Sequence, residues 1–381
     1  MQVETMVSRA PSSSKLPLAT LIDAQLILYF ISSDYEDKEA YIATLKETYK
    51  KARIIGCTTG GEIAEAEALD NSAVSAAIML ERSTIRIAQK SIRPIDDSYD
   101  AGQALAAQLV DKSLKLVFVL SDGLKINGTD LIDGITDHVD KGVIVTGGLA
   151  GDGARFLETG VGIDGVPKSD IIVAIGFYGE DFRVSYGSFG GWIKFGAERL
   201  ITRASGNVLY ELDGKPALDL YKKYLGDEAN NLPGSGLLFP LSIRPNKQSA
   251  HDIVRTIVGV NEEENSMIFA GDIPEGYIAQ LMHGTTDNLV EGAEAAASFA
   301  LSNAPHTSRN NHSLAILVSC IGRKLLMGQR ASAEVEAVKE IMGRIPLAGF
   351  YSYGEICPHP ETGKCGLHNQ TMTITLLSER L

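Results

Sequence analysis

One eight-residue frame, G-x-x-x-x-G-E-I, occurs once in each half of the chain. Residues 56–63 read GCTTGGEI and residues 349–356 read GFYSYGEI, and each copy follows a helical stretch and a short apolar segment. The matching context indicates an internal duplication. A duplicated chain is expected to fold into two related halves whose turns lie near each other, and ligand sites often form at interfaces of this kind.

The glycines of the frame constrain the backbone more than its other positions do. The first glycine is expected where a Cβ would crowd a neighbouring strand, and the second allows a positive φ that directs the Glu carboxylate after it. The alternative is a pair of ordinary tight turns whose glutamates, Glu62 and Glu355, are solvated. The two interpretations differ in what surrounds these carboxylates.

The distribution of apolar runs predicts a mixed fold. A chain of 381 residues suggests two or three domains, and 44% hydrophobic with 22% charged residues excludes global disorder. A long β-rich stretch at residues 170–192 interrupts the regular strand–helix alternation of a Rossmann protein. We expect an α/β or α+β fold of two comparable halves, made pseudo-symmetric by the duplication, each with a mixed β-sheet and covering helices.

Charge and cysteine content exclude several classes of protein. A net charge of −13 argues against nucleic-acid binding, because phosphate backbones attract Lys and Arg stripes. The longest apolar runs are too short to span a membrane, and no secretory leader opens the sequence. Four cysteines without a leader suit free thiols in a reducing compartment. We therefore expect a cytoplasmic protein without membrane insertion.

Six short segments together resemble a known family. They are residues 56–63, 121–123, 147–152, 319–323, 349–356 and 367–371. Their order and spacing are similar to those of the FIST sensory proteins, which contain an N-terminal and a C-terminal FIST domain. The expected organisation is a flexible tail at residues 1–14, a FIST N-like domain at residues 15–199 and a FIST C-like domain at residues 200–381.

The resemblance also implies a function. FIST proteins are regarded as intracellular sensors that bind small ligands, with amino acids proposed, and they are often fused to signalling modules. This chain leaves no segment for a kinase, methyl-accepting or cyclase module. We therefore expect an amino-acid-like ligand and a signal that passes through a separate signalling protein.

Polar side chains of the second half form the candidate ligand site. Arg323 is expected to bind a ligand carboxylate through its planar fork, and Glu355 to meet an ammonium group. Tyr351 and Tyr353 lie at alternate strand positions and supply apolar faces with polar tips. The full set is Cys320, Arg323, Tyr351, Tyr353, Glu355, His368, Asn369 and Thr371. The alternative for each residue is a satisfied structural hydrogen bond.

An enzymatic alternative depends on one cysteine. Cys320 follows an apolar strand and precedes Gly322 and Arg323, where a thiol pKa can be lowered. With His368 as the base, Cys320 would be the nucleophile of a hydrolase or transferase. The competing interpretation, which we favour, is a buried cysteine that lines a pocket wall.

A zinc site is a second alternative. Cys357, His359, Cys365 and His368 offer four soft ligands within a short segment, although their spacing matches no standard finger. The competing interpretation is a loop followed by a strand, with His368 hydrogen-bonded in the ligand site. The glycine-rich residues 147–153 match neither phosphate-binding pattern, so we expect no cofactor.

Overall fold

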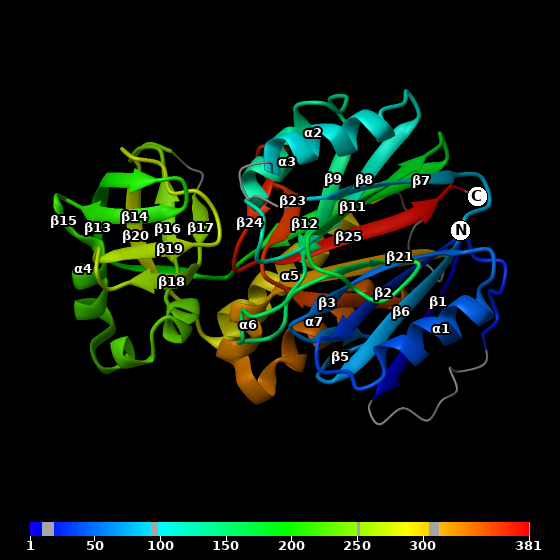
Figure 1. Ribbon diagram of the computed structural model, residues 1–381, viewed down its shortest axis with the longest axis horizontal. Coiled ribbons are helices and arrows are strands. Elements are labelled where there is room, and N and C mark those ends of the chain that lie inside the picture. The colour runs from blue at the N-terminus through cyan, green and yellow to red at the C-terminus, as the bar shows by residue number, and fades with distance from the viewer. Residues whose placement is uncertain (10–18, 93–97, 250–251, 305–311, 381) are drawn as a thin grey trace.

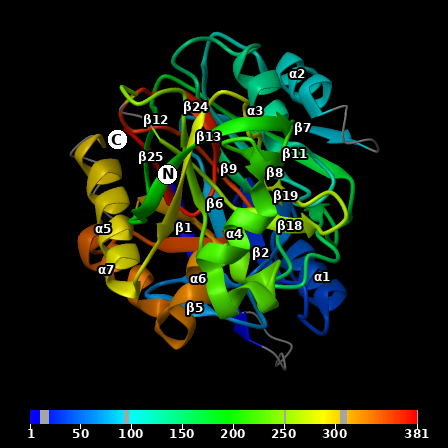
Figure 2. The ribbon, with the colours of Figure 1, turned by 90° about the vertical axis from the view of Figure 1, so that its left-hand side faces the viewer.

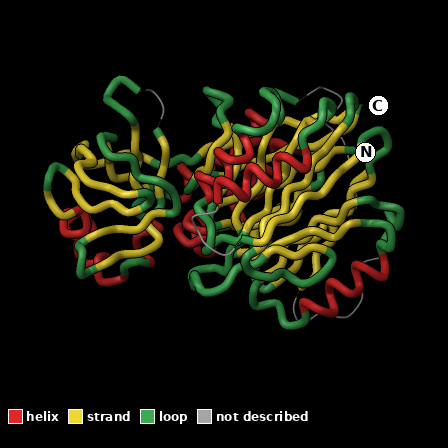
Figure 3. Tube along the Cα trace, turned by 45° about the horizontal axis from the view of Figure 1, so that its top comes forward, coloured by secondary structure: helices red, strands yellow, loops and turns green. Residues whose placement is uncertain are grey.

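The computed structural model describes residues 1–9, 19–92, 98–249, 252–304 and 312–380. A larger body contains three β-sheets, and a smaller lobe, residues 193–283, projects from one end of it (Figure 1). In both parts, strands outnumber helices (Figure 3). The helices among the described residues are α1 (Lys38–Thr48), α2 (Ser98–Leu109), α3 (Gly128–Thr136), α4 (Ala217–Leu225), α5 (Thr286–Ser302), α6 (Ile321–Met327) and α7 (Ser332–Met342).

The three sheets of the body combine strands from distant parts of the chain. The first sheet has the order β1 (Gln2–Arg9), β6 (Ser72–Met79), β2 (Leu26–Ser32), β3 (Arg53–Thr59) and β10 (Val161–Ile163). The second has the order β24 (Cys365–His368), β23 (Glu355–Pro358), β9 (Ile144–Leu149), β8 (Leu114–Ser121), β11 (Ile171–Tyr178) and β7 (Thr84–Ser91). The third has the order β12 (Phe182–Phe189), β25 (Met372–Glu379), β21 (Ser313–Cys320), β22 (Leu347–Ser352), β4 (Glu62–Ala64) and β5 (Glu67–Leu69).

All three sheets follow the same plan. In each sheet two neighbouring strands are parallel and are joined through helix: β2 and β3 through α1, β8 and β9 through α3, and β21 and β22 through α6 and α7. After its second parallel strand, each unit contributes a short strand to another sheet: β4 pairs with β22, β23 with β9, and β10 with β3. The body therefore contains three related units that exchange strands in a cycle.

A glycine at one equivalent position explains how the parallel strands approach each other. A Cβ on Gly56, Gly147 or Gly349 would overlap with a carbonyl oxygen of the paired parallel strand. Those carbonyls belong to Tyr29, Val119 and Leu317, the register partners of the three glycines. Only glycine fits at such a close approach. The repeated frame therefore begins at the same structural point in two units, and Gly147 marks that point in the third.

Backbone hydrogen bonds join the three units where the turns after their parallel strands meet. The Gly60 amide donates to the Tyr351 carbonyl over 2.8 Å, and the Leu149 amide donates to the Gly354 carbonyl over 2.9 Å. The Gly151 amide closes the cycle by donating to the Thr58 carbonyl over 3.0 Å. The turns predicted to lie near each other from the repeated frame are therefore in direct contact.

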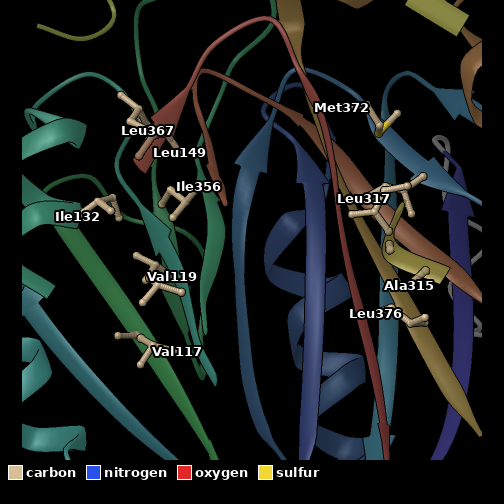
Figure 4. Packing of buried hydrophobic residues seen from close by; sticks show 14 of the residues in the cluster. Val117, Val119, Ile132, Leu149, Ala315, Leu317, Ile356, Leu367, Met372 and Leu376 are labelled. Carbon is tan, nitrogen blue, oxygen red and sulfur yellow. The ribbon is translucent and has the colours of Figure 1, made fainter. Parts of the chain in front are cut away.

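The core lies on both faces of the sheets, as the alternation along β8 shows. Leu116, Phe118 and Leu120 pack among the other two sheets, whereas Val117 and Val119 pack under α2 and α3. The buried cluster shown in Figure 4 includes Val117, Val119, Ile132, Leu149, Ile356, Leu367, Ala315, Leu317, Met372 and Leu376. Strands buried on both faces account for the continuous apolar runs of the sequence.

The lobe is an insertion between β12 and α5. Its strands are β13 (Ile193–Ser205), β14 (Val208–Leu212), β15 (Lys215–Pro216), β16 (Leu241–Arg244), β17 (Ile253–Arg255), β18 (Ile257–Asn261), β19 (Ser266–Phe269) and β20 (Ile278–His283). They enclose a separate hydrophobic core with α4. Viewed from the end, the lobe lies in front of the body (Figure 2). The boundary expected between residues 199 and 200 falls within β13.

Two further expectations concern the start of the chain and the membrane. Of the expected tail at residues 1–14, Gln2–Arg9 form β1, which pairs along its whole length with β6, so this part is a strand. Residues 10–14 lie outside the described residues. Among the helices that the structure describes, none combines the length and the apolar character that a membrane span requires.

Candidate functional site

A cavity of about 470 Å³ lies where the lobe meets the body. The body contributes β24, the loop at residues 359–364 and the segment after β12, and the lobe contributes β17 and Met282. Phe189, Trp192 and Leu367 supply apolar wall, together with Val254 of the lobe. The volume falls in the range of small-molecule sites, which are mostly apolar with a few convergent polar groups.

Four residues that line this cavity each carry a buried polar atom without a hydrogen-bond partner among the described residues. These atoms are Thr129 Oγ1, Ser188 Oγ, Asp252 Oδ1 and Asn369 Oδ1. A buried polar group without a partner costs about 1–3 kcal/mol, and most such groups in proteins are satisfied. Their concentration around one cavity is therefore the signature of a site that receives a polar ligand.

Arg255 provides a buried cation at the cavity. Its side chain is 4% exposed, and it donates to the carbonyls of Asp272 at 3.0 Å and of Leu367 at 3.3 Å. No ion pair with Arg255 occurs among the described residues. Burial lowers its pKa to about 10, and nearby Asp272 acts in the opposite direction, so the guanidinium is charged at neutral pH. Buried charges in proteins are normally paired, so a guanidinium in this position suits an anionic ligand group.

Further charged side chains line the cavity, Asp252 and Asp133 among them. Asp252 pairs through Oδ2 with Lys194, which leaves Oδ1 as a buried acceptor. Asp133 of α3 is half-buried at the wall, and burial raises its pKa. The lining thus includes the buried Arg255 cation and the carboxylates of Asp252 and Asp133, together with the charged side chains of Glu361 and Lys364.

Three of the predicted ligand residues line the cavity: His368, Asn369 and Thr371. Nε2 of His368 hydrogen-bonds with the Cys357 carbonyl at 2.8 Å, and therefore donates. Burial lowers the pKa of His368 to about 4, so its imidazole is neutral at pH 7. The Nδ2 group of Asn369 donates to the His368 carbonyl at 3.0 Å, while its Oδ1 lacks a partner.

Arg323 lies elsewhere and contacts protein groups. It is fully buried, and its guanidinium binds Glu334 Oε2 at 2.7 Å and 3.0 Å through two nitrogens. Its other donors bind the carbonyls of Gly190, Leu289 and Gln370. Because these partners occupy its donors, Arg323 holds the segments beside the cavity together and does not itself line it.

The glutamates of the repeated frame are both buried, which contradicts the alternative of solvated glutamates. Glu355 accepts from Ser352 Oγ at 2.7 Å and from the Thr371 amide at 3.2 Å. Glu62 accepts in the same way from the Ser72 amide at 3.2 Å. Burial raises the pKa of Glu355 to about 8 and that of Glu62 to about 7, although these hydrogen bonds act in the opposite direction. Glu62 thus fixes the start of β6, and Glu355 fixes the start of β25.

Tyr351 and Tyr353 also lie outside the cavity lining. Tyr351 is fully buried, with Lys324 Nζ 5.3 Å from its ring centre. Tyr353 stacks on Phe156 with ring centres 4.5 Å apart, and its hydroxyl donates to Asp152. Both rings pack at the junction of the three units.

The structure does not bring Cys320 and His368 together as a nucleophile and its base. Cys320 lies at the start of α6, and burial, assisted by nearby Glu355, raises the pKa of its thiol. The thiol is therefore protonated at neutral pH, and His368 bonds to the Cys357 carbonyl instead. This geometry does not support the hydrolase or transferase alternative.

The four potential zinc ligands are likewise directed to different partners. The Cys357 thiol points to the Gly187 carbonyl at 3.9 Å, and the Cys365 thiol to the Val145 carbonyl at 3.2 Å. The rings of His359 and His368 are 6.2 Å apart. Within the described ranges, no group of three or more His, Cys, Asp or Glu side chains is placed to hold a metal ion.

The polar cavity residues that were not predicted from the sequence include Thr129, Ser188, Asp252 and Arg255. They come from α3, β12 and the lobe, which meet only in the folded chain. The one usable signal was Arg255, a charged residue within the apolar stretch Ile253 to Val260. A buried charge in a strand is rare unless it has a partner or a ligand.

Comparison with known proteins identifies the family. The FIST N domain model matches residues 25–215, and the FIST C domain model matches residues 217–358. The chain therefore belongs to the FIST family, and the two domains are of comparable size. FIST domains are sensory domains of signal transduction.

Two curated relatives come from mycobacteria. Uncharacterized proteins of Mycobacterium bovis and of Mycobacterium tuberculosis are each 25% identical to this chain over 183 residues. The match covers 46% of this chain and 46% of each relative, so the chain matches about half of their length.

Proposed function

We propose that this protein is a cytoplasmic sensor that binds an amino-acid-like molecule in the cavity between lobe and body. The observation that carries the proposal is the convergence of Arg255 and four unpaired polar atoms on one cavity. The Arg255 guanidinium suits a carboxylate, and Asp252 Oδ1 and Asn369 Oδ1 suit the N–H groups of an ammonium. Trp192 and Phe189 offer apolar surface to a side chain.

The residues predicted for ligand binding divide into three groups under this proposal. His368, Asn369 and Thr371 face the ligand. Cys320, Arg323 and Glu355 contact residues 370–371 from behind, whereas Tyr351 and Tyr353 pack at the junction of the three units. Glu355 holds Thr371 through its amide and hydroxyl, and Arg323 binds the carbonyl of Gln370. Buried supporting groups of this kind keep the direct contacts in place.

The position of the cavity supports a signalling role. A ligand there touches both the lobe and the body, which share few polar contacts among the described residues besides the bond from Arg255 to the Leu367 carbonyl. Asn127 Nδ2 donates to Asp272 Oδ1 at 3.1 Å, and Gln370 Nε2 donates to the Leu237 carbonyl at 2.8 Å. A ligand that prefers one lobe position shifts the population toward it, and a separate signalling protein reads the change.

Thermal unfolding with a panel of free amino acids and related zwitterions tests the proposal. A ligand at 100 times its Kd stabilises the native state by about 2.7 kcal/mol and raises the melting temperature. The Asp252→Ala variant should lose that rise. Lys194→Ala is the matched control, because it removes the same ion pair and leaves the cavity carboxylate in place. An unchanged melting temperature across the panel contradicts the proposal.

A further inference from the structure

Strand β24 is an edge strand that lines the cavity, and no further strand of the described residues pairs with it. It is the last strand of the second sheet, with β23 on its other side. The His359 amide donates to the Lys364 carbonyl, so Lys364 directs its backbone toward β23. In an antiparallel ladder every second residue does the same, so Gly366 and His368 also bond to β23. Cys365 and Leu367 therefore direct their backbone groups away from β23, and the Leu367 carbonyl does meet Arg255 from that side. This edge can pair with another strand.

Strand β17 of the lobe faces the same cavity and is also an edge strand. The Pro240 carbonyl accepts from the Met282 amide, so Pro240 directs its backbone toward β20. Successive residues of a strand direct their backbone groups to opposite sides, so Leu241 and Ile243 bond to β17 instead. Val254 then directs its backbone away from β16, and its carbonyl accepts from Arg255 Nη1 at 3.3 Å. One guanidinium group therefore contacts both edges.

The equivalent edge in the third sheet is covered by the chain itself. Pairing of Glu62 with Leu69 corresponds to pairing of Glu355 with His368, so Ala68 of β5 is the counterpart of Leu367. The Ala68 amide donates to Ser332 Oγ of α7 at 3.1 Å, and Lys324 of α6 binds the Leu69 carbonyl at 3.4 Å. In the second sheet, a cavity replaces this helical cover.

We propose that the ligand of the cavity is a short extended peptide, which adds to the free edge of β24. The inference rests on the proposed function and names its ligand class. Main-chain hydrogen bonds to a sheet edge supply affinity, and flanking pockets supply specificity. Arg255 binds a peptide carbonyl or the terminal carboxylate, and Asp252 Oδ1 and Asn369 Oδ1 accept from peptide N–H groups.

The cavity volume agrees with a peptide. At about 470 Å³ it falls within the range of about 300–1,000 Å³ that small-molecule sites span. Sites of that size enclose drug-sized ligands, which are larger than most free amino acids and comparable with a peptide of about two or three residues. Apolar wall at Phe189, Trp192 and Met282 favours at least one apolar side chain.

Calorimetric titration of the full chain with a tripeptide library and with the constituent free amino acids tests the inference. The best tripeptide is then resynthesised with a methyl group on one backbone nitrogen at a time. Strand pairing uses alternate backbone N–H groups, so methylation at the pairing position should weaken binding at least about tenfold, while methylation next to it has a smaller effect.

The outcomes separate the two proposals. Tripeptide binding with this alternating sensitivity supports the inference. Free amino acids that bind as tightly as any tripeptide, or tripeptides indifferent to backbone methylation, overturn the peptide inference and leave the proposed sensor intact. Binding of neither class overturns both.

Discussion

Two buried arginines show how partners decide the role of a side chain. Arg323 forms a buried ion pair with Glu334, whereas Arg255 meets only carbonyl oxygens among the described residues. Arg323 is therefore neutralised within the fold, whereas Arg255 forms no ion pair among the described residues. The sequence pointed to Arg323 because it follows a strand and a glycine, but sequence alone does not reveal that Glu334 lies opposite.

Removing Arg323 should destabilise the protein. Arg323→Leu leaves the Glu334 carboxylate buried without its partner, and breaking such pairs costs about 3–5 kcal/mol. Urea unfolding measures the change. Arg330→Leu, which removes an exposed pair with Asp287, is the control and should change stability by less than about 1 kcal/mol. Equal effects of the two substitutions would contradict the structural role assigned to Arg323.

The buried carboxyl of Glu355 should make stability depend on pH. Its pKa is about 8 in the folded chain, above the ordinary value of 4.5. Its contribution to the free energy of unfolding is therefore fully present below about pH 4.5 and is lost as the pH rises through 8. Glu355→Gln removes this loss. The variant should gain about 4 kcal/mol relative to the native protein between pH 5 and pH 9, measured by urea unfolding. A difference that is constant across pH argues against the assignment.

At the scale of elements, the repeated frame predicted two of three related units. The third unit reads GGLAGD from Gly147, one residue shorter before its acid. That acid, Asp152, accepts instead from the amides of Phe156, Leu157 and Glu158 at 2.9 Å each. In this unit Asp122, and not Asp152, fixes the start of β11, because its carboxylate accepts from the Asp170 amide at 2.9 Å. The third copy was hidden because its acid changed position and partners.

Helix α3 begins at a residue that also contacts the lobe. Asn127 Oδ1 accepts from the amides of Thr129 at 3.0 Å and Asp130 at 3.3 Å, and Nδ2 donates to Asp272 of the lobe. Asn127→Ala should cost about 1 kcal/mol through loss of the cap. Asn127→Asp keeps the cap acceptor but loses the donor, so it should weaken the lobe contact specifically.

Hydrogen exchange distinguishes the two Asn127 variants. Asn127→Asp should increase exchange at the lobe–body junction while α3 stays protected, whereas Asn127→Ala should increase exchange in both places. Faster exchange of α3 in the Asp variant, with an unchanged junction, would mean that the contact with Asp272 does not hold the lobe.

At the scale of the whole molecule, the cavity unites segments far apart in the chain. Residues 188–192 precede the lobe, residues 252–255 lie within it, and residues 365–371 follow it. The mixed fold, the short buried strands and the contact between the repeated turns follow from apolar patterning and glycine placement. The insertion and the resulting cavity do not, because they depend on which strand edges remain uncovered after folding.

Ligand binding should change the relation between lobe and body. Because the cavity is lined from both sides, a bound ligand should slow exchange of amides in β17 and β24 together. Hydrogen exchange with and without the best-binding compound measures this effect. Protection confined to one of the two strands would mean that the ligand does not bridge them, and the signalling part of the proposal would then fail.

The central claim is that the cavity beside Arg255 receives a zwitterionic, amino-acid-like molecule. Electron density from crystals soaked with the best-binding compound tests it most directly. The account predicts a carboxylate or carbonyl oxygen at the Arg255 guanidinium and N–H groups at Asp252 Oδ1 and Asn369 Oδ1. Density for the compound at another site, with only water in this cavity, would contradict it.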